Sequence, residues 1–311
     1  MRHFCVLGSL NMDMVTRVTR FPRPGETISG ISFNIFPGGK GANQAVALAR
    51  LGAAVEMVGA VGDDVLGARY EAVLDDAGVG RGSLARIAGV STGTASIEVT
   101  TSGENHIVVV AGANEALTPA FVEARRDRIE DASFLLLQLE IPMESVLAAA
   151  HIAAAAGVPV MLDPAPARPL PPELYPLLSI ITPNEHEAAI LTDEDTRDDA
   201  GIARAGAALL ARGVRCAVIK AGSRGAFVVD AAGTRRVPGF AVHVVDTVAA
   251  GDSFNAGLAF ALSRAASSAA GNDAVRFANA VGALSTTKEG AQSAMPTEVE
   301  VFALLESADK A

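Results

Sequence analysis

The chain has few of the residues on which several classes of protein depend. Among its 311 residues there are only two cysteines, Cys5 and Cys216, which lie far apart and outside any CxxC or Cys/His cluster. This excludes a disulfide framework and a zinc module, and it favours a reducing cytoplasm. Lys and Arg total 25 against 35 for Asp and Glu, and there is no long basic run. We therefore expect no binding to nucleic acid or to anionic membranes.

Long hydrophobic segments are also missing. The N-terminal stretch reaches Asn11 and Asp13 after an apolar run that is too short for a signal peptide, so we expect none. The longest apolar segment, 145–162, is interrupted by His151 and by Gly-Val-Pro at 157–159, which predicts a helix and then a strand rather than a membrane span. Half of the residues are apolar, as in a globular protein of about two domains or one large domain with an insertion.

Short β-rich runs alternate with helical stretches rich in Ala and Leu, a pattern typical of a parallel sheet with crossover helices. The patterns predict strands at 4–10, 55–61, 134–139, 158–162, 180–182 and 214–220. They predict helices at 42–51, 66–76, 119–129, 142–156, 202–211, 250–263, 274–286 and 298–306. The predicted fold class is α/β, with a doubly wound, mostly parallel central sheet flanked by helices.

Two segments break this alternation. Apolar residues recur with period two at 31–35 and 95–99, and the second segment turns at 102–105 into a further apolar run. Half-buried strands of this kind predict a small second sheet over the carboxyl edge of the main sheet, where open α/β sheets bind ligands. We assign 13–36 and 92–111 to this small β-lid, and 1–12, 37–91 and 112–311 to the large domain.

Two familiar nucleotide-binding motifs are absent from the sequence. The first predicted strand leads into Gly8-Ser9-Leu10-Asn11, which is not the GxGxxG of dinucleotide-binding folds. Lys40 lies in PGGKGAN, which lacks the first Gly and the Ser or Thr of a P-loop. If the chain binds a nucleotide, it does so in another way.

The strongest local signal is DTVAAGDSF at 246–254, a loop of small residues that opens into a helix. The N–H groups of Ala250, Gly251 and Asp252 would point outward there, where the helix dipole favours an anion. Asp252 could accept a proton beside that anion, as the base of a kinase accepts a hydroxyl proton from its substrate. From these residues alone, a carboxylate that serves only the helix dipole is an equally good interpretation.

Three further motifs carry polar residues toward the ends of predicted elements. GGKGAN at 38–43 precedes a helix, although it could be a simple glycine turn. Asn11 and Asp13 could hydrogen-bond neighbouring hydroxyls of a sugar, with turn chemistry as the alternative. Asn184 and Glu187 share a helix face, which suits water-mediated binding of Mg²⁺, although helix capping by Asn184 is the ordinary alternative.

Together these motifs resemble the ribokinase branch of the PfkB family of sugar kinases, over nearly the whole chain. The resemblance rests on GSLNMD, PGETISG, PGGKGANQA, LLLQLEIP, DPAPAR, ITPNEHEA, KAGSRGAFVV, DTVAAGDSFNAG and KEGAQ, in family order. PGGKGANQA combined with DTVAAGD is highly specific for this family. Chance assembly of all these motifs in order is negligible, so the alternative interpretations of single motifs lose most of their weight.

The resemblance implies a role for each matching residue. The sugar-binding positions, besides Asp252 as catalytic base, are Asn11, Asp13, Gly39, Lys40, Asn43 and Glu140. The anion hole is Ala249, Ala250 and Gly251. The ATP-binding positions, besides Gly251, are Asn184, Lys220, Ala221, Gly222, Ser223, Arg224, Gly225 and, at the adenine, Asn279. Glu187 matches a magnesium-associated acidic residue, and a monovalent-cation loop matches Asp246, Val248, Ser285, Lys288 and Gly290.

Three positions depart from the family pattern. Ala249 replaces the first Gly of the common GAGD motif, which is harmless if its φ is negative. Asn279 stands where a His often flanks the adenine, so stacking would be weaker there. Ala294 occupies a position where a Ser can complete the cation site.

The resemblance implies ATP-dependent phosphorylation of D-ribose at its 5-hydroxyl, giving ribose 5-phosphate and ADP, with Mg²⁺ and an activating K⁺. Because the edges of the lid need cover, we expect a cytoplasmic homodimer joined through the lid. A kinase of 2-deoxyribose, fructose, 2-keto-3-deoxygluconate or a nucleoside would use the same machinery. A catalytically silent sugar- or nucleotide-binding regulator is a remote alternative, against which Asp252 and the Asn184/Glu187 pair argue.

Overall fold

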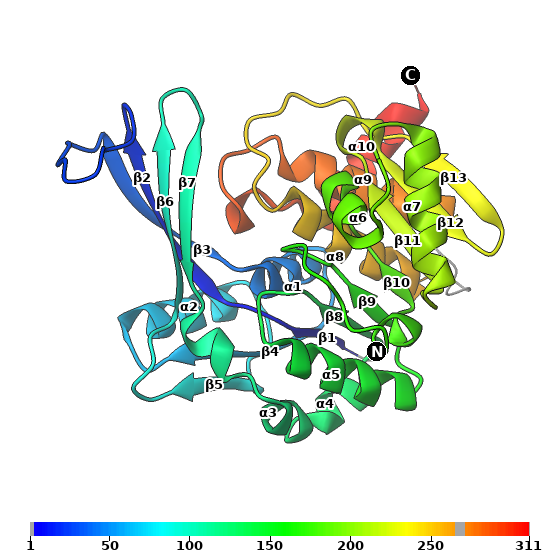
Figure 1. Cartoon of the computed structure of the whole chain (residues 1–311), viewed down its shortest axis with the longest axis horizontal. Coiled ribbons are helices and arrows are strands. Elements are labelled where there is room, and N and C mark those ends of the chain that lie inside the picture. Colours follow the sequence, from blue (N-terminus) through cyan, green and yellow to red (C-terminus); the bar gives the residue numbers. More distant parts are fainter. Residues whose placement is uncertain (1–2, 265–270, 311) are drawn as a thin grey trace.

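The large domain is built on one twisted sheet (Figure 1). The computed structural model describes residues 3–264 and 271–310; positions 1–2, 265–270 and 311, assigned above to the large domain, lie outside the described residues. The strands of this sheet are β1 (Phe4–Leu7), β4 (Val55–Gly62), β5 (Leu84–Ile87), β8 (Phe134–Leu137), β9 (Val160–Leu162), β10 (Ile180–Ile181), β11 (Cys216–Lys220), β12 (Ala226–Asp230) and β13 (Gly233–Val237).

The strand order is β13-β12-β11-β10-β9-β8-β1-β4-β5. All neighbouring pairs from β11 to β5 are parallel, whereas β12 and β13 are antiparallel additions at one edge. The chain therefore proceeds from β1 toward β5 on one side, and from β8 toward β13 on the other. This confirms the predicted doubly wound sheet, with its switch point between β1 and β8, where such sheets bind ligands beyond the carboxyl ends of their strands.

Helices cover both faces of the sheet. Their bounds are α1 (Lys40–Arg50), α2 (Val65–Asp76), α3 (Pro119–Glu123), α4 (Arg126–Glu130), α5 (Met143–Ala155), α6 (Glu185–Thr192), α7 (Asp199–Ala211), α8 (Ala250–Arg264), α9 (Asn272–Ser285) and α10 (Glu298–Asp309). Short 3₁₀ helices lie at η1 (Gly112–Ala116), η2 (Tyr175–Leu177), η3 (Gly222–Arg224) and η4 (Gln292–Ala294).

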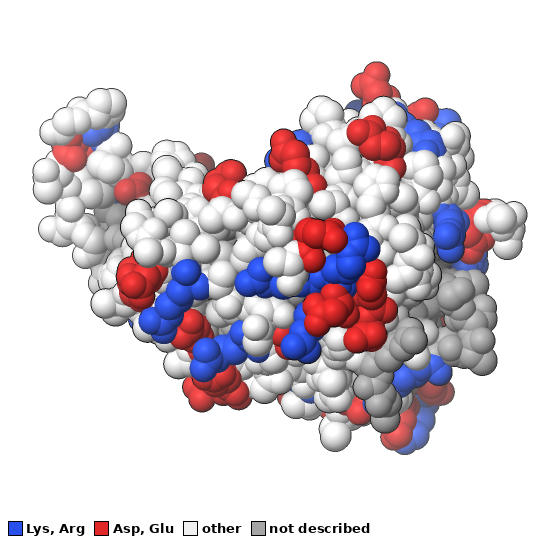
Figure 2. Space-filling model, turned by 90° about the horizontal axis from the view of Figure 1, so that it is seen from below, with Lys and Arg blue, Asp and Glu red and all other residues white. Residues whose placement is uncertain are grey.

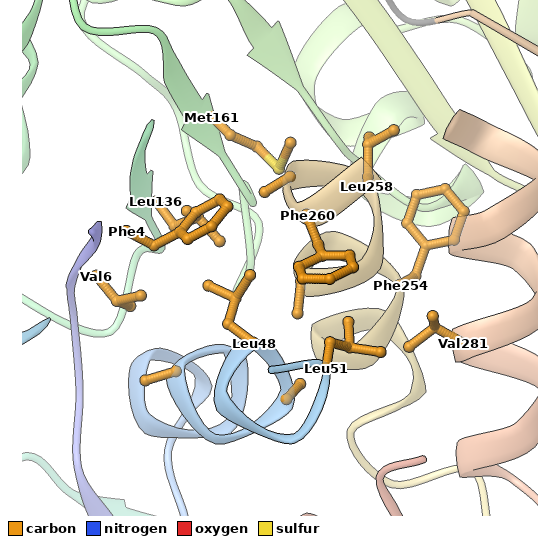
Figure 3. Packing of buried hydrophobic residues seen from close by; sticks show 14 of the residues in the cluster. Phe4, Val6, Leu48, Leu51, Leu136, Met161, Phe254, Leu258, Phe260 and Val281 are labelled. Atoms are coloured by element: carbon orange, nitrogen blue, oxygen red, sulfur yellow. The ribbon is translucent and has the colours of Figure 1, made fainter. Parts of the chain in front are cut away.

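Alternate residues of the strands face opposite layers. In β1, Phe4 and Val6 join a buried cluster with α1, α8 and α9, whereas Cys5 and Leu7 join a second cluster with α3 and α5. Figure 3 shows the first cluster, where side chains of the sheet meet Leu48 of α1 and Phe260 of α8. This packing brings the N-termini of α1 and α8 to the same carboxyl edge of the sheet, because both helices cover one face of it.

The second sheet has four strands: β2 (Asn11–Val18), β3 (Ser32–Gly38), β6 (Gly93–Thr100) and β7 (Asn105–Val110). They lie in the order β3-β2-β6-β7, with β2 and β6 parallel and the outer pairs antiparallel. This sheet projects from the large domain at the left of Figure 1. It is the small sheet expected from residues 31–35 and 95–110, and the exact domain bounds 13–36 and 92–111 remain a prediction.

Several predicted elements differ from the structure. The strand expected at 4–10 ends at Leu7, and Asn11–Val18, most of which falls in the predicted lid, forms a strand, β2, that the patterns did not predict. The helix expected at 119–129 is divided into α3 and α4, because Arg125 adopts a non-helical conformation (φ −122°, ψ 19°) and its side chain donates to the carbonyl oxygens of Ser83 and Phe121. The patterns also missed β5, β12 and β13.

Charged side chains on the face seen in Figure 2 lie in mixed groups, with basic residues beside acidic ones. Many of the surface ion pairs are of this kind, including Arg86 with Glu71 at 2.6 Å and Arg126 with Glu123 at 2.7 Å. Each exposed pair contributes about 0–1 kcal/mol to stability. Among the described residues, no helix is both long and apolar enough to cross a membrane.

Candidate active site

The site begins where the N-terminus of α1 meets the residues after β1. Gly39 precedes α1 with φ 88°, and a Cβ there would lie 2.7 Å from the backbone nitrogen of Asn11, so only glycine fits. This close approach lets the Lys40 N–H donate to Glu140 Oε2 at 3.1 Å, while the Ser9 hydroxyl donates to the same oxygen at 2.5 Å. Glu140, which follows β8, is thereby held at the switch point of the sheet.

The lid contributes Asn11 and Asp13 from β2. The Asp13 carboxylate packs against Gly38 of β3, and Asn11 Oδ1 accepts a hydrogen bond from Asn114 at 2.9 Å. Burial, and next the nearby charge of Glu140, raise the pKa of Asp13 from 3.8 to about 7. Asp13 and Glu140 therefore form an acidic pair at the base of the lid, with oxygens suited to accept hydrogen bonds from hydroxyl groups.

Asp252 lies buried in the first turn of α8, facing α1. Its two carboxylate oxygens accept hydrogen bonds from Asn43 Nδ2 at 3.0 Å and from Gln44 Nε2 at 3.3 Å. Burial raises the pKa of Asp252 from 3.8 to about 6; Lys40 opposes this shift and Asp163 adds to it. Asp252 is thus a carboxylate whose proton affinity is close to that required of a base at neutral pH.

The orientation of Asn43 is set by a second amide. Gln292 donates to Asn43 Oδ1 at 3.1 Å and to the Tyr70 hydroxyl at 2.9 Å, and that hydroxyl donates to the Gly38 carbonyl oxygen. Because its oxygen is occupied in this way, Asn43 presents its NH₂ group to Asp252, which can only accept when ionised.

The loop before α8 leaves some of the expected backbone N–H groups without an acceptor. Among the described residues, the N–H groups of Gly251 and Asp252 have no protein acceptor, as expected at a helix N-terminus. The expectation for Ala250 is wrong: its N–H closes a turn by donating to the Thr247 carbonyl at 3.3 Å. Gly251 and Asp252, and not Ala250, therefore offer their backbone N–H groups to an anion.

The premise that Ala249 has a negative φ is also wrong. Its φ is 59°, in the left-handed region, because the chain must reverse direction there to enter α8. For a residue with a Cβ this conformation costs about 1–2 kcal/mol. A strained residue next to the free N–H groups is typical of a functional site.

Beside this loop, Lys220 at the end of β11 forms a buried ion pair with Asp163 at 3.0 Å. A Cβ added to Gly251 would lie 3.4 Å from Lys220 Nζ, so the ammonium group reaches the anion loop. Lys40, at the start of α1, is a second ammonium group near Asp252. Burial alone would lower the pKa of Lys40, but Asp252, Asp163 and Glu140 together raise it above its ordinary value. The ammonium groups of Lys40 and Lys220 therefore both lie near the first turn of α8.

A cavity of about 760 Å³ extends from Asp252 between α6, α9 and the loop at 238–249. The predicted site residues that line it are Lys40, Asn184, Glu187, Lys220, Gly222, Ser223, Gly225, Ala249, Ala250, Gly251, Asp252 and Asn279. Predicted positions outside its lining include Ala221, which is buried, and Arg224, whose guanidinium pairs with Glu185 and Asp199. The cavity is large enough for a small-molecule ligand.

Asn184 and Glu187 have the capping arrangement that was the ordinary alternative. Asn184 Oδ1 accepts from the Glu187 N–H at 2.8 Å, and Glu187 Oε2 accepts from the Asn184 N–H at 2.7 Å, at the start of α6. Both residues nevertheless line the cavity. Asn279 donates to the carbonyl oxygens of Val237 and Pro238, so it holds the cavity loop in place.

Asp246 connects the two segments that make up the predicted cation loop. Its carboxylate accepts from the backbone N–H groups of Val248 and Gly290, both at 3.0 Å, and so joins the loop before α8 to the segment after α9. Ser285 is buried and donates to the Gly282 carbonyl. Lys288 points away and pairs with Glu300 at 2.9 Å, so it does not neutralise Asp246.

Besides Ser9 and Tyr70, sequence reasoning missed five polar residues of the site. Asp163, Gln138 and Gln292 occur in DPAPAR, LLLQLEIP and KEGAQ, and Gln44 occurs in PGGKGANQA, but no role was derived for them because their partners come from distant segments. Asn114 lies outside every motif and is identified only by its contacts with Leu10 and Asn11. The motifs were therefore a sufficient signal for four of the five positions.

The fold and the site define an ATP-dependent carbohydrate kinase. The profile described as pfkB family carbohydrate kinase matches residues 1–298, and the chain belongs to this family. The chain is 42% identical to the ribokinases of Haemophilus influenzae and Bacillus subtilis, over 97% and 98% of its length and 98% and 100% of theirs. The structure of Arabidopsis thaliana ribokinase complexed with ribose and ATP has a TM-score of 0.93 and 34% identity, over 98% of this chain and 99% of that one.

The raised pKa of Asp13 predicts that the protein is less stable at high pH, where this site carboxylate is ionised. The folded state binds this proton more tightly than the unfolded state, so wild-type stability falls as pH rises from about 4 to 7. Asp13→Asn removes the titration, and at pH 8 we expect it to increase the free energy of unfolding by about 2 kcal/mol, allowing for water in the open cleft. Urea denaturation at pH 8 and pH 4 measures this difference.

At pH 4 most of the gain should disappear, because Asp13 is then neutral in the folded state and partly protonated in the unfolded state. Asp127→Asn serves as the control, since that side chain is largely exposed on α4. Equal effects of the Asp13 substitution at the two pH values would contradict the prediction.

Proposed function

We propose that the protein phosphorylates D-ribose at the 5-hydroxyl, giving ribose 5-phosphate and ADP. The observation that carries this proposal is the place of Asp252, which lies between the acidic sugar-side residues and the large cavity. The names of the relatives at 42% identity support ribose as the sugar. A cytoplasmic location is supported by the two cysteines, both buried free thiols.

In this proposal each group of residues has a separate task. Asp13, Asn43 and Glu140 accept or donate hydrogen bonds to the hydroxyls of ribose, together with Asn11, Gly39 and Lys40. Asp252 takes the proton from the 5-hydroxyl as that oxygen attacks the terminal phosphorus of ATP. The N–H groups of Gly251 and Asp252, with Lys220 beside them, stabilise charge on the transferring phosphoryl group. The lid excludes water when it closes over the sugar.

The residues at the mouth of the cavity fit a magnesium ion carried by ATP. Glu187 lines the cavity and uses Oε2 for capping, whereas no described donor contacts its Oε1. That oxygen could hold the hydration shell of Mg²⁺, a cation that keeps several water ligands in proteins. When bound with ATP, the ion would supply neutralisation of phosphate charge.

A second candidate substrate is 2-deoxyribose, because the chain is also 34% identical to the deoxyribokinase of Salmonella typhi. The acidic pair of Asp13 and Glu140 favours ribose over this sugar. A buried carboxylate that loses a hydroxyl partner is left without a hydrogen bond, which costs about 1–3 kcal/mol or more.

Asp252→Asn tests the assignment of the base. We expect kcat to fall by about 10²–10⁴-fold, because Asn cannot take the proton, while the affinities for ribose and ATP change little. ADP release should be measured for wild type and variant with ribose, 2-deoxyribose, fructose, 2-keto-3-deoxygluconate and adenosine. Asp127→Asn, on an exposed surface, is the matched control.

Ribose should have the highest kcat/KM of the panel. A different preferred sugar would overturn the substrate but leave the kinase assignment intact. A variant that retains more than about a tenth of the wild-type kcat would overturn the role of Asp252.

The loop joined by Asp246 is proposed to bind K⁺. Its carboxylate has acceptor capacity beyond the two N–H groups that it binds, and no lysine or arginine pairs with it in the described part of the chain. The carbonyl groups that end α9 are further oxygen ligands. Val248, Ser285, Lys288 and Gly290 would contribute mostly through their backbone. The ion would hold the loop whose N–H groups meet the phosphoryl group.

K⁺ should therefore raise kcat in a saturable manner. The measurement is activity in sodium-free buffer with tetramethylammonium as counterion, titrated with KCl at constant ionic strength. Asp246→Ala should abolish the response, whereas Glu289→Gln, an exposed carboxylate in the neighbouring segment, should retain it. A flat response of the wild type would remove the cation site from the proposal.

The lid is proposed to form a homodimer with the lid of a second copy. Large apolar side chains are exposed on both faces of its sheet: Phe33, Val108 and Val110 on one face, and Ile107 and Val109 on the other, each between 52% and 65% exposed. Exposed apolar side chains gathered along β7, on both faces of a small sheet, are typical of an interaction surface. The outer edge of β7 also lacks a pairing strand within the described residues.

Val108→Glu should convert the dimer to a monomer and raise the KM for ribose, because a charge would be buried in the joined lids. Light scattering after size exclusion measures the mass. The same substitution at an exposed valine of α2, Val65→Glu, should leave the dimer intact. A monomeric wild-type protein would contradict the proposal.

A further inference from the structure

Gln44 lies in α1, almost fully buried, directly behind the site. Its Nε2 atom lies 3.3 Å from Asp252 Oδ1 and 3.2 Å from Asp163 Oδ2, so it donates to two different carboxylates. Its Oε1 atom accepts from Gln138 Nε2 at 2.7 Å. A primary amide has two N–H hydrogens, and each of them has a partner here.

This arrangement leaves Gln44 no hydrogen with which to bind a substrate. Gln138, at the end of β8, also fixes which way the amide of Gln44 faces, because a donor on Oε1 requires the NH₂ group to face the two carboxylates. Gln138 Oε1 is itself buried without a partner among the described residues, and it packs so closely on Gly8 that a Cβ there would lie 1.9 Å away. The whole pair is therefore held rigidly between β1, β8 and α1.

The two carboxylates that Gln44 joins have different tasks. Asp252 is the proposed base, on α8, whereas Asp163 follows β9 and holds Lys220 at 3.0 Å. Lys220 in turn reaches the anion loop at Gly251. One side-chain nitrogen thus connects the group that takes the proton with the cation beside the phosphoryl site.

We infer that Gln44 is a positioning residue, which holds the Asp252 carboxylate in a fixed place relative to the Asp163–Lys220 pair. The inference rests on the proposed function, because it requires Asp252 to be the base. It adds a residue that touches neither the sugar nor ATP. Gln44 holds the carboxylates of Asp163 and Asp252 near each other by donating to both of them.

The charged groups around Asp252 determine how its pKa would change if the Gln44 donor were removed. Lys40 faces it from α1, Glu140 from the segment after β8, and Asp163 from the segment after β9, where Lys220 partly neutralises it. A donor to the charged form of an acid favours that form, and a neighbouring carboxylate disfavours it. Without Gln44 one of the two donors that favour the charged form would be lost while the repulsion from Asp163 remained, so Asp252 would take up a proton at higher pH.

Gln44→Met tests the inference, because methionine retains the volume of glutamine and has no N–H. We expect kcat to fall about ten- to a hundredfold through misplacement of the base, with the KM for ribose and for ATP within about threefold of wild type. The acidic limb of the kcat–pH profile should move to higher pH. Gln138→Met should produce a smaller change in the same direction, since it releases the amide of Gln44 without removing its hydrogens.

Two controls separate this inference from a loss of stability and from the proposed function. Ser145→Ala removes a buried hydrogen bond to the Leu117 carbonyl, in the opposite helical layer, and should lower stability while kcat is unchanged. Asp252→Asn tests the base itself. If Asp252→Asn is inactive while Gln44→Met keeps kcat within twofold and an unmoved pH profile, the inference is overturned and the proposed function stands.

If Asp252→Asn remains active, the proposed base is wrong and the inference fails with it. A lower kcat for Gln44→Met with an unchanged pH profile would assign Gln44 a structural role only and also overturn the inference. Should Gln44→Met not fold, Gln138→Met decides the question by the same two measurements, kcat and the midpoint of its acidic limb.

Discussion

The contact between the N-terminal turns of α1 and α8 is the interaction on which the site depends. Both helices cover one face of the sheet, and their N-terminal ends meet where Asn43 and Gln44 donate to Asp252. A buried carboxylate without donors would be strongly destabilising, so these two amides make its burial possible. Burial in turn gives Asp252 a pKa near 6, which suits a base at neutral pH. The sugar side and the cavity are arranged around this contact.

The site is also a balance of charges at the switch point of the sheet. Glu140, Asp163 and Asp252 lie around Lys40, Asp163 also pairs with Lys220, and Asp13 lies near Glu140. The strands that carry or precede most of these acidic groups end side by side. Several acidic groups held this closely disfavour the folded state at high pH, as the raised pKa of Asp13 indicates. They would become useful when hydroxyl groups of a substrate donate to them. The same acidic groups therefore lower the stability of the substrate-free protein and would bind the substrate.

Strain and exposed apolar surface are found at the same places as the proposed chemistry. Ala249 has a left-handed conformation immediately before the free N–H groups of Gly251 and Asp252. The lid leaves Phe33 and Val108 more than half exposed in the described part of the chain. Both features disfavour an isolated, empty protomer, and both are explained if the anion loop and the lid act on a bound substrate within a dimer.

The sequence by itself determined the α/β class, because alternating apolar runs and Ala-rich helices report locally on burial, and its motifs identified Asp252, Asn43 and Glu140. It did not predict β2 as a separate strand, because β2 follows β1 after only Gly8, Ser9 and Leu10. Nor did it reveal that the Ala250 N–H closes a turn, or that Ala249 has a positive φ. Only the tertiary structure decided which amide faces which carboxylate. Gln44, Gln138 and Asp163 come from three separate segments, and their hydrogen bonds exist only because parallel strands end at one edge of the sheet.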